Sequence, residues 1–177
     1  MYSKDKIERV CSLYASEWHL ATMILPTLNK KILDEENFIT FFETNFTEYM
    51  STLTERANLK ELEKRKVLSI AWDSKNIINY REIERYLDYS IKSNTTFNII
   101  VNGKDDYTNE VNKNVSLYIN KNMKRFLKES IKICIINCFD ISEGKQDMEK
   151  IIKFHDKMLN TSGIKEIEYH ENKLNAM

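Results

Sequence analysis

The turn between the first apolar segment and the first helical pattern reads Tyr14-Ala-Ser-Glu-Trp-His19. A phosphate-binding α/β protein places a glycine-rich loop here. That loop ends in Lys-Ser or Lys-Thr, so that backbone N–H groups approach the phosphates. This turn has no glycine and no lysine, and the carboxylate of Glu17 would repel a phosphate. We therefore do not expect nucleotide hydrolysis by such a loop.

Two larger side chains of the same turn, Trp18 and His19, could line a ligand pocket. Trp18 is more simply explained as an anchor that packs its helix onto a sheet. His19 is more simply a surface histidine, because no Ser or Cys at a matching strand end would form a nucleophilic pair with it.

Four carboxylates follow apolar segments, where α/β enzymes often place metal-binding or catalytic groups. They are Asp73, the neighbours Asp105 and Asp106, and Asp140. Asp73 and Asp140 are also ordinary loop or cap residues, and two acids that open a helix are explained by the helix dipole. A magnesium-dependent nucleotide or phosphoryl-transfer enzyme remains an alternative. It requires at least two of these carboxylates to converge within metal-ligand reach. We expect neither a metal nor a cofactor.

Three cysteines, Cys11, Cys134 and Cys138, do not form a disulfide framework. Cys134 and Cys138 are four residues apart in an expected strand, so their side chains should point to the same face as buried thiols. The three histidines are scattered along the sequence and suggest no metal site.

Apolar strand patterns alternate with amphipathic helix patterns along the chain. The expected strands are 8–14, 37–43, 67–72, 96–102, 131–139 and 164–169. The expected helices are 17–33, 47–54, 58–64, 80–92, 106–128 and 146–159. Such alternation predicts an α/β fold, a RecA/KaiC-like three-layer sandwich with a mostly parallel central sheet of about six strands and helices on both faces.

Three local features refine this prediction. Residues 131–139 are almost continuously apolar, so this strand should lie at the centre of the sheet. Pro26 lies within the first helix and should bend it or divide it into two pieces. Gly163 is a plausible end for the last helix.

Ligands of open α/β sheets bind at the carboxyl ends of the strands. The loops to search are 14–19, 43–46, 72–76, 102–107 and 139–145. Our candidate ligand-binding residues in them are Tyr14, Glu17, Trp18, His19, Trp72, Asp73, Asn102 and Asp140. Aromatic residues at the loop ends could form an apolar pocket for a small organic ligand, although ordinary core is the favoured explanation. These aromatics are Tyr14, Trp18, Phe46, Trp72, Tyr107 and Phe139.

The composition fits one globular domain of 177 residues, with 42% hydrophobic and 31% charged residues. Lys plus Arg and Asp plus Glu both number 27, and this balance lowers the expectation of nucleic-acid binding. No segment approaches the ~20 consecutive apolar residues of a membrane span, and residues 1–8 do not lead into a signal core. We expect a cytoplasmic protein without membrane contact.

Four segments resemble the MEDS domain, a sensory domain described from methanogens and methylotrophs and found in the dichloromethane-response regulator. They are Val10-Cys-Ser-Leu-Tyr-Ala-Ser-Glu-Trp-His-Leu20, Val67-Leu-Ser-Ile-Ala-Trp72, Ile99-Ile-Val-Asn-Gly103 and Cys134-Ile-Ile-Asn-Cys-Phe-Asp140. The similarity spans roughly residues 7–167 and is one of pattern more than identity. The chain departs from the family where a His often precedes the first Cys, and where Lys104 displaces an acidic residue.

The resemblance implies a RecA- or KaiC-like sheet that has lost its phosphate loop and serves a sensory role. We therefore expect a non-enzymatic signalling domain in a bacterial stress or developmental pathway. It would act by binding a small apolar ligand or a regulatory protein, such as a histidine kinase or a transcription regulator, and a homodimer is compatible with this role. Besides the magnesium enzyme, a pure protein-interaction module remains an alternative. It would show a large exposed apolar patch and no enclosed pocket.

Overall fold

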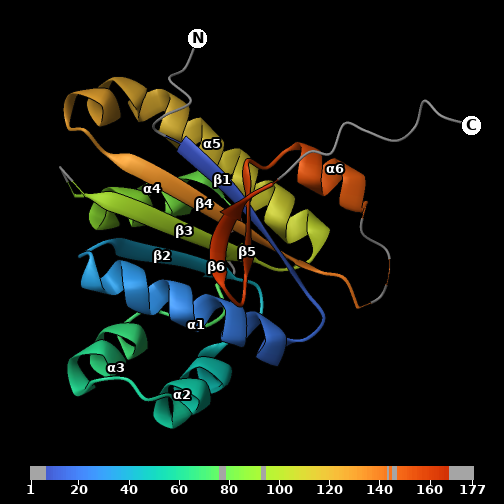
Figure 1. Cartoon of the computed structure of the whole chain (residues 1–177). Helices are drawn as coiled ribbons and strands as arrows, with labels where there is room; N and C mark the ends of the chain where they lie inside the picture. Colours follow the sequence, from blue (N-terminus) through green and yellow to red (C-terminus); the bar gives the residue numbers. More distant parts are fainter. Residues whose placement is uncertain (1–6, 76–78, 93–94, 143, 145–146, 168–177) are drawn as a thin grey trace, which may run out of the picture.

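The computed structural model describes residues 7–75, 79–92, 95–142, 144 and 147–167. Its strands are β1 (Ile7–Tyr14), β2 (Asn37–Phe42), β3 (Thr96–Asn102), β4 (Lys132–Asp140), β5 (Lys157–Asn160) and β6 (Gly163–Glu166). Its helices are α1 (Glu17–Leu33), α2 (Thr47–Arg56), α3 (Glu61–Leu68), α4 (Tyr80–Ser90), α5 (Asp105–Lys128) and α6 (Met148–Lys153). The strands form one six-stranded sheet with helices on both faces, which confirms the expected α/β class (Figure 1).

The strand order is β2-β3-β4-β1-β5-β6, so the apolar strand β4 lies inside the sheet as expected. It pairs in parallel with β1, from Ile7 opposite Ile133 to Tyr14 opposite Asp140, and in parallel with β3 on its other side. β2 pairs in parallel with β3, and β5 with β1. Only β6 is antiparallel to its neighbour β5, so the sheet is mostly parallel. The carboxyl ends of β1 to β4 therefore lie at one end of the sheet.

The two faces of the sheet carry separate apolar cores. One core joins α1, α2 and α3 to the face that includes Ile100 and Ile136. The other joins α4 and α5 to the opposite face, which includes Ile99 and Ile135. Neighbouring residues of one strand serve opposite cores because side chains alternate along a strand. The result is the three-layer arrangement predicted from the sequence.

The first helix is continuous from Glu17 to Leu33, so Pro26 does not divide it into two pieces, and the alternative of a bend stays a prediction. Ser16 caps the helix by accepting a hydrogen bond from the backbone N–H of His19 at 3.2 Å. Pro26 removes the amide that would bond to the carbonyl of Thr22. Thr22 and Pro26 both lie on the exposed side of the helix, where water can satisfy that carbonyl.

The expected strand 67–72 does not form, and the expected helix 58–64 is shifted to Glu61–Leu68. Val67 belongs to that helix, and Trp72 lies in the loop that follows it. The indole Nε1–H of Trp72 donates to the carbonyl of Val67 at 2.9 Å, and its own carbonyl accepts from the N–H of Phe46 at 2.8 Å. The apolar run is therefore a core-filling turn. Only Ser74 forms a bridge to the edge strand, at Phe42.

The expected helix 146–159 is also wrong over most of its length; Gln146 itself lies outside the described residues. α6 ends at Lys153, and Lys157–Asn160 instead forms β5. The edge of β1 that does not pair with β4 pairs instead with β5, where Cys11 lies opposite Met158. Gly163, expected to end the helix, opens β6 with a φ of 103° at the turn of a hairpin. The edge-strand prediction is confirmed for 164–166, and Tyr169 lies outside the described residues.

The remaining element predictions agree closely with the structure. The strand 96–102 has the expected bounds, and α5 begins one residue earlier than expected. Cys134 and Cys138 both lie in the core beneath α1, as expected for buried thiols on one face. Every helix of the described residues is too short or too polar to cross a membrane.

Candidate functional site

A pocket of about 710 Å³ opens at the carboxyl ends of β1, β2, β3 and β4. It is lined by Tyr14, Glu17, Glu43, Thr44, Asn102, Gly103, Lys104, Asp105, Asp106 and Asp140. We call it the carboxyl-end pocket. Four of the eight residues predicted from the sequence, Tyr14, Glu17, Asn102 and Asp140, lie on its wall. The rule that ligands bind at strand carboxyl ends thus pointed to the end of the sheet where this pocket lies, and ligand binding there stays a prediction.

The inner wall of the pocket is a neutral hydrogen-bonded pair. The phenol of Tyr14 donates to Oδ1 of Asn102 at 2.9 Å, and both side chains are buried. Burial, and then the nearby Cys138 and Asp140, raise the pKa of Tyr14 far above its usual value. The phenol therefore stays protonated and binds β1 to β3 across the intervening strand β4.

The rim is built by a close approach of β2 and β3. The carboxylate of Glu43 accepts a hydrogen bond from the backbone N–H of Lys104 at 2.6 Å. A Cβ at Gly103 would lie 2.5 Å from the ring of Tyr107 and 2.8 Å from Cβ of Glu43, so only glycine fits there. The Tyr107 hydroxyl donates to the carbonyl of Lys75 at 2.9 Å. Burial and the Glu43 carboxylate raise the pKa of Tyr107 to about 12.

The charge of the lining is strongly one-sided. The lining carries five carboxylates and a single ammonium group, that of Lys104. The carboxylates belong to Glu17, Glu43, Asp105, Asp106 and Asp140. Such a lining creates a negative potential in the pocket, which disfavours phosphate and favours cations. This agrees with the phosphate repulsion expected from Glu17.

Three of the four carboxylates considered for magnesium line the same pocket, but the described residues there are not arranged as metal ligands. Asp105, Asp106 and Asp140 line the carboxyl-end pocket, whereas Asp73 does not. Within the described part of the chain, no group of three or more His, Cys, Asp or Glu side chains is arranged to hold a metal ion. Asp140 is engaged locally, because its Oδ1 accepts from the N–H of Ser142 at 2.8 Å.

The other four candidate residues do not line this pocket. Trp18 is 45% exposed and meets Tyr49 of α2 edge-on at 5.0 Å, so the expectation that it packs on the sheet is wrong. His19 lies on the surface, as expected, and its Nδ1 accepts from the N–H of Ala15 at 3.3 Å. Trp72 is buried in the core and Asp73 is exposed in a loop. A ligand role for these four residues stays a prediction.

The aromatic residues at the loop ends do not converge into one apolar pocket. Phe46 is stacked on Phe42 at 4.8 Å, and Trp72 meets Phe42 edge-on at 5.7 Å, all within the core beneath α1. Of the six aromatics considered, only Tyr14 lines the carboxyl-end pocket. Ordinary core, the explanation favoured from the sequence, accounts for Phe46 and Trp72.

Six lining residues were not among the candidate ligand-binding residues: Glu43, Thr44, Gly103, Lys104, Asp105 and Asp106. All six fall in the searched loops 43–46 and 102–107. Asp105 and Asp106 had been considered only as carboxylates of the alternative magnesium site, and the other four residues were signalled only by their position just after a strand. The parallel pairing of β2 with β3 brings Phe42 opposite Asn102 and so places the two loops side by side.

We compared the chain with protein-family models, with curated protein sequences and with solved structures, and none matches. The resemblance to the MEDS domain therefore stays a prediction.

Proposed function

We propose that this chain is a non-enzymatic signalling domain that binds a small, positively charged organic molecule in the carboxyl-end pocket. The observation that carries the proposal is the excess of five carboxylates over one ammonium group around a pocket of about 710 Å³. That volume lies within the range of about 300–1,000 Å³ that is typical of small-molecule sites. The proposed ligand thus differs in charge from the apolar ligand expected from the sequence.

The lining groups suggest how such a ligand would be held. Carboxylates accept hydrogen bonds from an ammonium group, and these charge-assisted bonds are the stronger ones. Glu43 and Asp140 are already fixed by backbone N–H groups, those of Lys104 and Ser142. Fixed carboxylates lose little side-chain freedom when a ligand binds, which favours affinity. The Thr44 hydroxyl adds a neutral hydrogen-bonding group to the lining.

A binding role, rather than catalysis, is supported by the chemistry of the lining. The described residues around the pocket include no Ser, Cys or His that could act as an activated nucleophile or as a base for one. The phenol of Tyr14 is held to Asn102 and its pKa is raised. The MEDS resemblance, where it applies, adds a sensory role.

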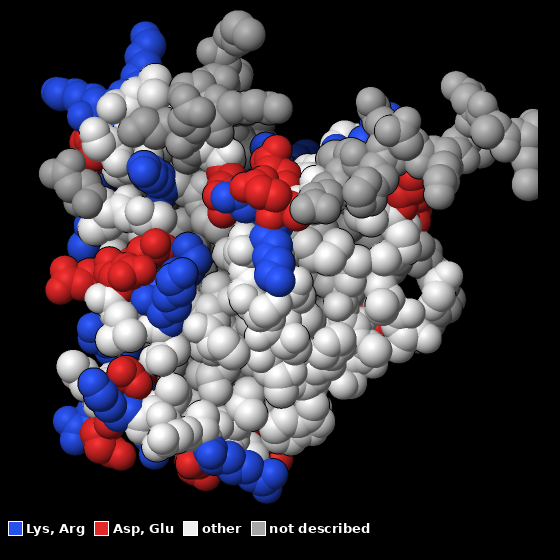
Figure 2. Space-filling model, in the orientation of Figure 1, with Lys and Arg blue, Asp and Glu red and all other residues white. Residues whose placement is uncertain are grey.

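The regulatory partner in this proposal would contact the surface around Trp18. The stretch from Trp18 to Asn29 contains no Lys, Arg, Asp or Glu, although these residues make up 31% of the chain. Figure 2 shows the corresponding surface over the N-terminal half of α1, where charged side chains are sparse. Exposed aromatic residues in such surroundings are typical of protein contacts. Because Glu17 lines the pocket next to Trp18, ligand binding could alter this surface directly.

Isothermal titration calorimetry with three four-carbon probes tests the ligand class. Putrescine, butanediol and succinate have similar lengths but are positive, neutral and negative. We expect only putrescine to bind, with an affinity that falls as salt screens the carboxylates. The double variant Glu43→Gln with Asp140→Asn keeps the hydrogen-bond acceptors and removes two charges. We expect it to weaken binding by about tenfold or more.

The matched control is Glu55→Gln, which removes an exposed carboxylate of α2 away from the pocket. It should leave putrescine binding unchanged. Equal binding of succinate and putrescine would contradict the proposed ligand class. Turnover of ATP by the purified chain, abolished by Asp73→Ala, would contradict the non-enzymatic role.

A further inference from the structure

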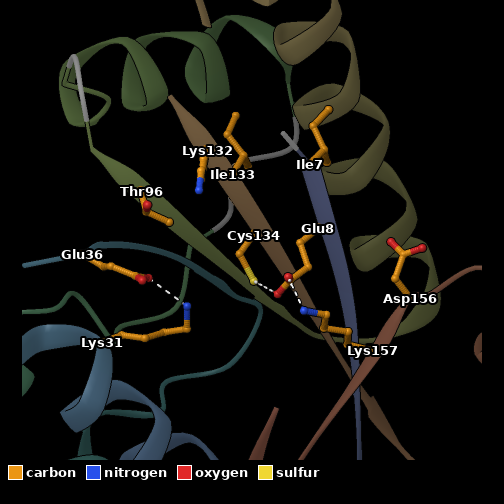
Figure 3. A pocket seen from close by; sticks show the side chains of 10 residues that line it. All are labelled: Ile7, Glu8, Lys31, Glu36, Thr96, Lys132, Ile133, Cys134, Asp156 and Lys157. Atoms are coloured by element: carbon orange, nitrogen blue, oxygen red, sulfur yellow. Dashed lines mark hydrogen bonds and ion pairs between the residues drawn. The ribbon is translucent and has the colours of Figure 1, made fainter. Parts of the chain in front are cut away.

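A second pocket, of about 400 Å³, lies at the opposite end of the sheet (Figure 3). We call it the amino-end pocket. Its lining comes from the first residues of β1, β3, β4 and β5, together with the end of α1 and the turn that follows it. The rule for α/β sheets directs attention to carboxyl ends, so the sequence patterns did not indicate this pocket.

Two ion pairs hold most of the charges of this pocket in place. Nζ of Lys31 lies 2.8 Å from Oε2 of Glu36, and Nζ of Lys157 lies 2.8 Å from Oε2 of Glu8. Glu36 has a further partner, because its Oε2 accepts a hydrogen bond from the side-chain amide of Asn98 at 2.7 Å. These four charges are therefore held in ion pairs before any ligand arrives, and Lys157 has a second partner, Oε1 of Glu166 at 3.1 Å.

The same wall includes a thiol that adds no charge. Sγ of Cys134 lies 3.6 Å from Oε1 of Glu8, and this buried thiol can donate a weak hydrogen bond to that carboxylate. Burial is the main reason that the pKa of Cys134 is raised to about 12, so it stays protonated at neutral pH.

Two charged side chains of the lining remain without an ion pair. Among the described residues, neither Lys132 nor Asp156 lies within ion-pair distance of an opposite charge. The carboxylate of Asp156 accepts only a long bond, 3.4 Å, from the backbone N–H of Arg9. In the view of Figure 3, Lys132 lies near the top of the group of lining residues and Asp156 at its right-hand edge, beyond β1. One positive and one negative group are thus available, apart from each other.

We propose that the amino-end pocket binds a small zwitterion, with its carboxylate toward Lys132 and its ammonium group toward Asp156. Thr96, which is opposite Lys132 in the pairing of β3 with β4, offers a hydroxyl beside the bound carboxylate. Three lysines and three carboxylates line the pocket, so its formal charge sums to zero. A zwitterion matches this balance, whereas a ligand with one charge would leave either Lys132 or Asp156 unmatched.

Calorimetric titration of the full chain with glycine, ω-aminobutanoate and ω-aminohexanoate, whose amino groups are at the end of the carbon chain, tests this proposal. These zwitterions differ in the separation of their two charges, so the series also measures the spacing that the pocket prefers. Butanoate and butylamine are the matched probes with one charge each. We expect at least one zwitterion to bind about tenfold or more tightly than either of them.

Charge variants locate the bound zwitterion. Lys132→Gln and Asp156→Asn should each weaken binding about tenfold. The double variant Lys132→Asp with Asp156→Lys should restore binding, because the ligand can turn end for end. The control Lys124→Gln changes an exposed lysine of α5 outside the pocket and should have no effect. Circular dichroism of each variant confirms that the chain is folded.

Three results would overturn the proposal: no zwitterion binds, the singly charged probes bind equally well, or Lys132→Gln leaves zwitterion affinity unchanged. The double variant at Glu43 and Asp140 separates the two sites. It should weaken putrescine binding at the carboxyl-end pocket and leave zwitterion binding intact. Each proposal can therefore fail without the other.

Discussion

Glu8 and Tyr14 belong to the same strand, β1, yet the two ends of the sheet that they mark are built differently. At the carboxyl end Tyr14 is buried and pairs with the neutral amide of Asn102. Aromatic side chains pack near this end at Phe42, and five carboxylates and one ammonium group line the pocket. At the amino end Glu8 is partly exposed and pairs with Lys157. Apolar packing thus supports one pocket, and ion pairs surround the other.

This difference bears on what each pocket can bind. Apolar packing supports the carboxyl end, where the pocket lining carries more carboxylates than ammonium groups, and we propose a cationic ligand there. At the amino end most charges are held in ion pairs, and we propose a ligand of balanced charge there. Four predictions test this contrast, the first three from the largest expected effect to the smallest and the last as a function of pH.

Removal of the buried indole at the carboxyl end should have the largest effect on stability. Trp72→Ala deletes a side chain that contacts Phe42 and Phe46, and it should lower the free energy of unfolding by about 3–5 kcal/mol. Urea unfolding followed by circular dichroism measures this change. Trp18→Ala is the control, because Trp18 is 45% exposed and its loss should cost less than about 1 kcal/mol. Equal effects would show that the carboxyl end does not depend on this packing.

The neutral pair at the carboxyl end should come second. Tyr14→Phe leaves the buried Oδ1 of Asn102 without a donor, which should cost about 1–3 kcal/mol in the free energy of unfolding. The double variant Tyr14→Phe with Asn102→Leu should recover part of that loss. Tyr89→Phe, at a tyrosine that is 88% exposed, serves as the control and should be neutral. Additive losses in the double variant would show that the pair is not coupled.

The ion pairs at the amino end should contribute less than the neutral pair. Lys157→Met removes the ammonium group that pairs with Glu8 and Glu166, and it should lower the free energy of unfolding by at most about 1 kcal/mol, because all three side chains are at least partly exposed. The difference from the native chain should shrink in high salt, since screening weakens exposed pairs. Chemical unfolding at low and high salt measures both effects. A loss larger than that of Tyr14→Phe would reverse the contrast drawn here.

A pH series compares two lysines at opposite ends of the sheet. Burial lowers the pKa of Lys75, beside the end of β2, to about 8, whereas the bond to Glu8 raises the pKa of Lys157. Between about pH 8 and pH 10 the unfolded chain holds more protons on residue 75 than the folded chain does. Stability should therefore rise with pH in this window. The stabilisation from Lys157 persists there and is lost only as pH rises through its raised pKa.

Urea midpoints measured in steps across the window test the pH prediction. The rise should be absent in Lys75→Met and present in Lys157→Met. A rise of equal size in both variants would assign it to other groups.

The fold was predictable where a pattern was long or strongly periodic. The strand 96–102 and the helix α5 were placed within one residue of their bounds, because apolar runs and helical periodicity are local properties. The strand prediction for 67–72 was wrong because a short apolar segment does not distinguish a strand from a core-filling turn. The helix prediction for 157–160 was wrong because the conformation of this segment depends on pairing with β1, almost 150 residues earlier in the chain.

The candidate site was predictable in the same limited sense. Tyr14 and Asn102 were identified because each ends an apolar strand, and parallel strands end together. That their side chains would bond to each other could not be foreseen, since it requires the order of β1, β4 and β3. We did not predict the exposure of Trp18, because the sequence does not show that α2 leaves the outer face of the Trp18 side chain uncovered.

The sequence by itself determined the α/β alternation, the apolar character of β4 and the lack of a glycine-rich phosphate loop after β1. These are properties of neighbouring residues, and local sterics and periodicity suffice to express them. The tertiary structure alone decided which charges are neutralised and which face a pocket. Lys31 pairs with Glu36 and Lys157 with Glu8, while Lys132 and Asp156 face the amino-end pocket without an ion pair among the described residues. The physical reason is that Coulomb attraction depends on distance in space, and strand order sets that distance.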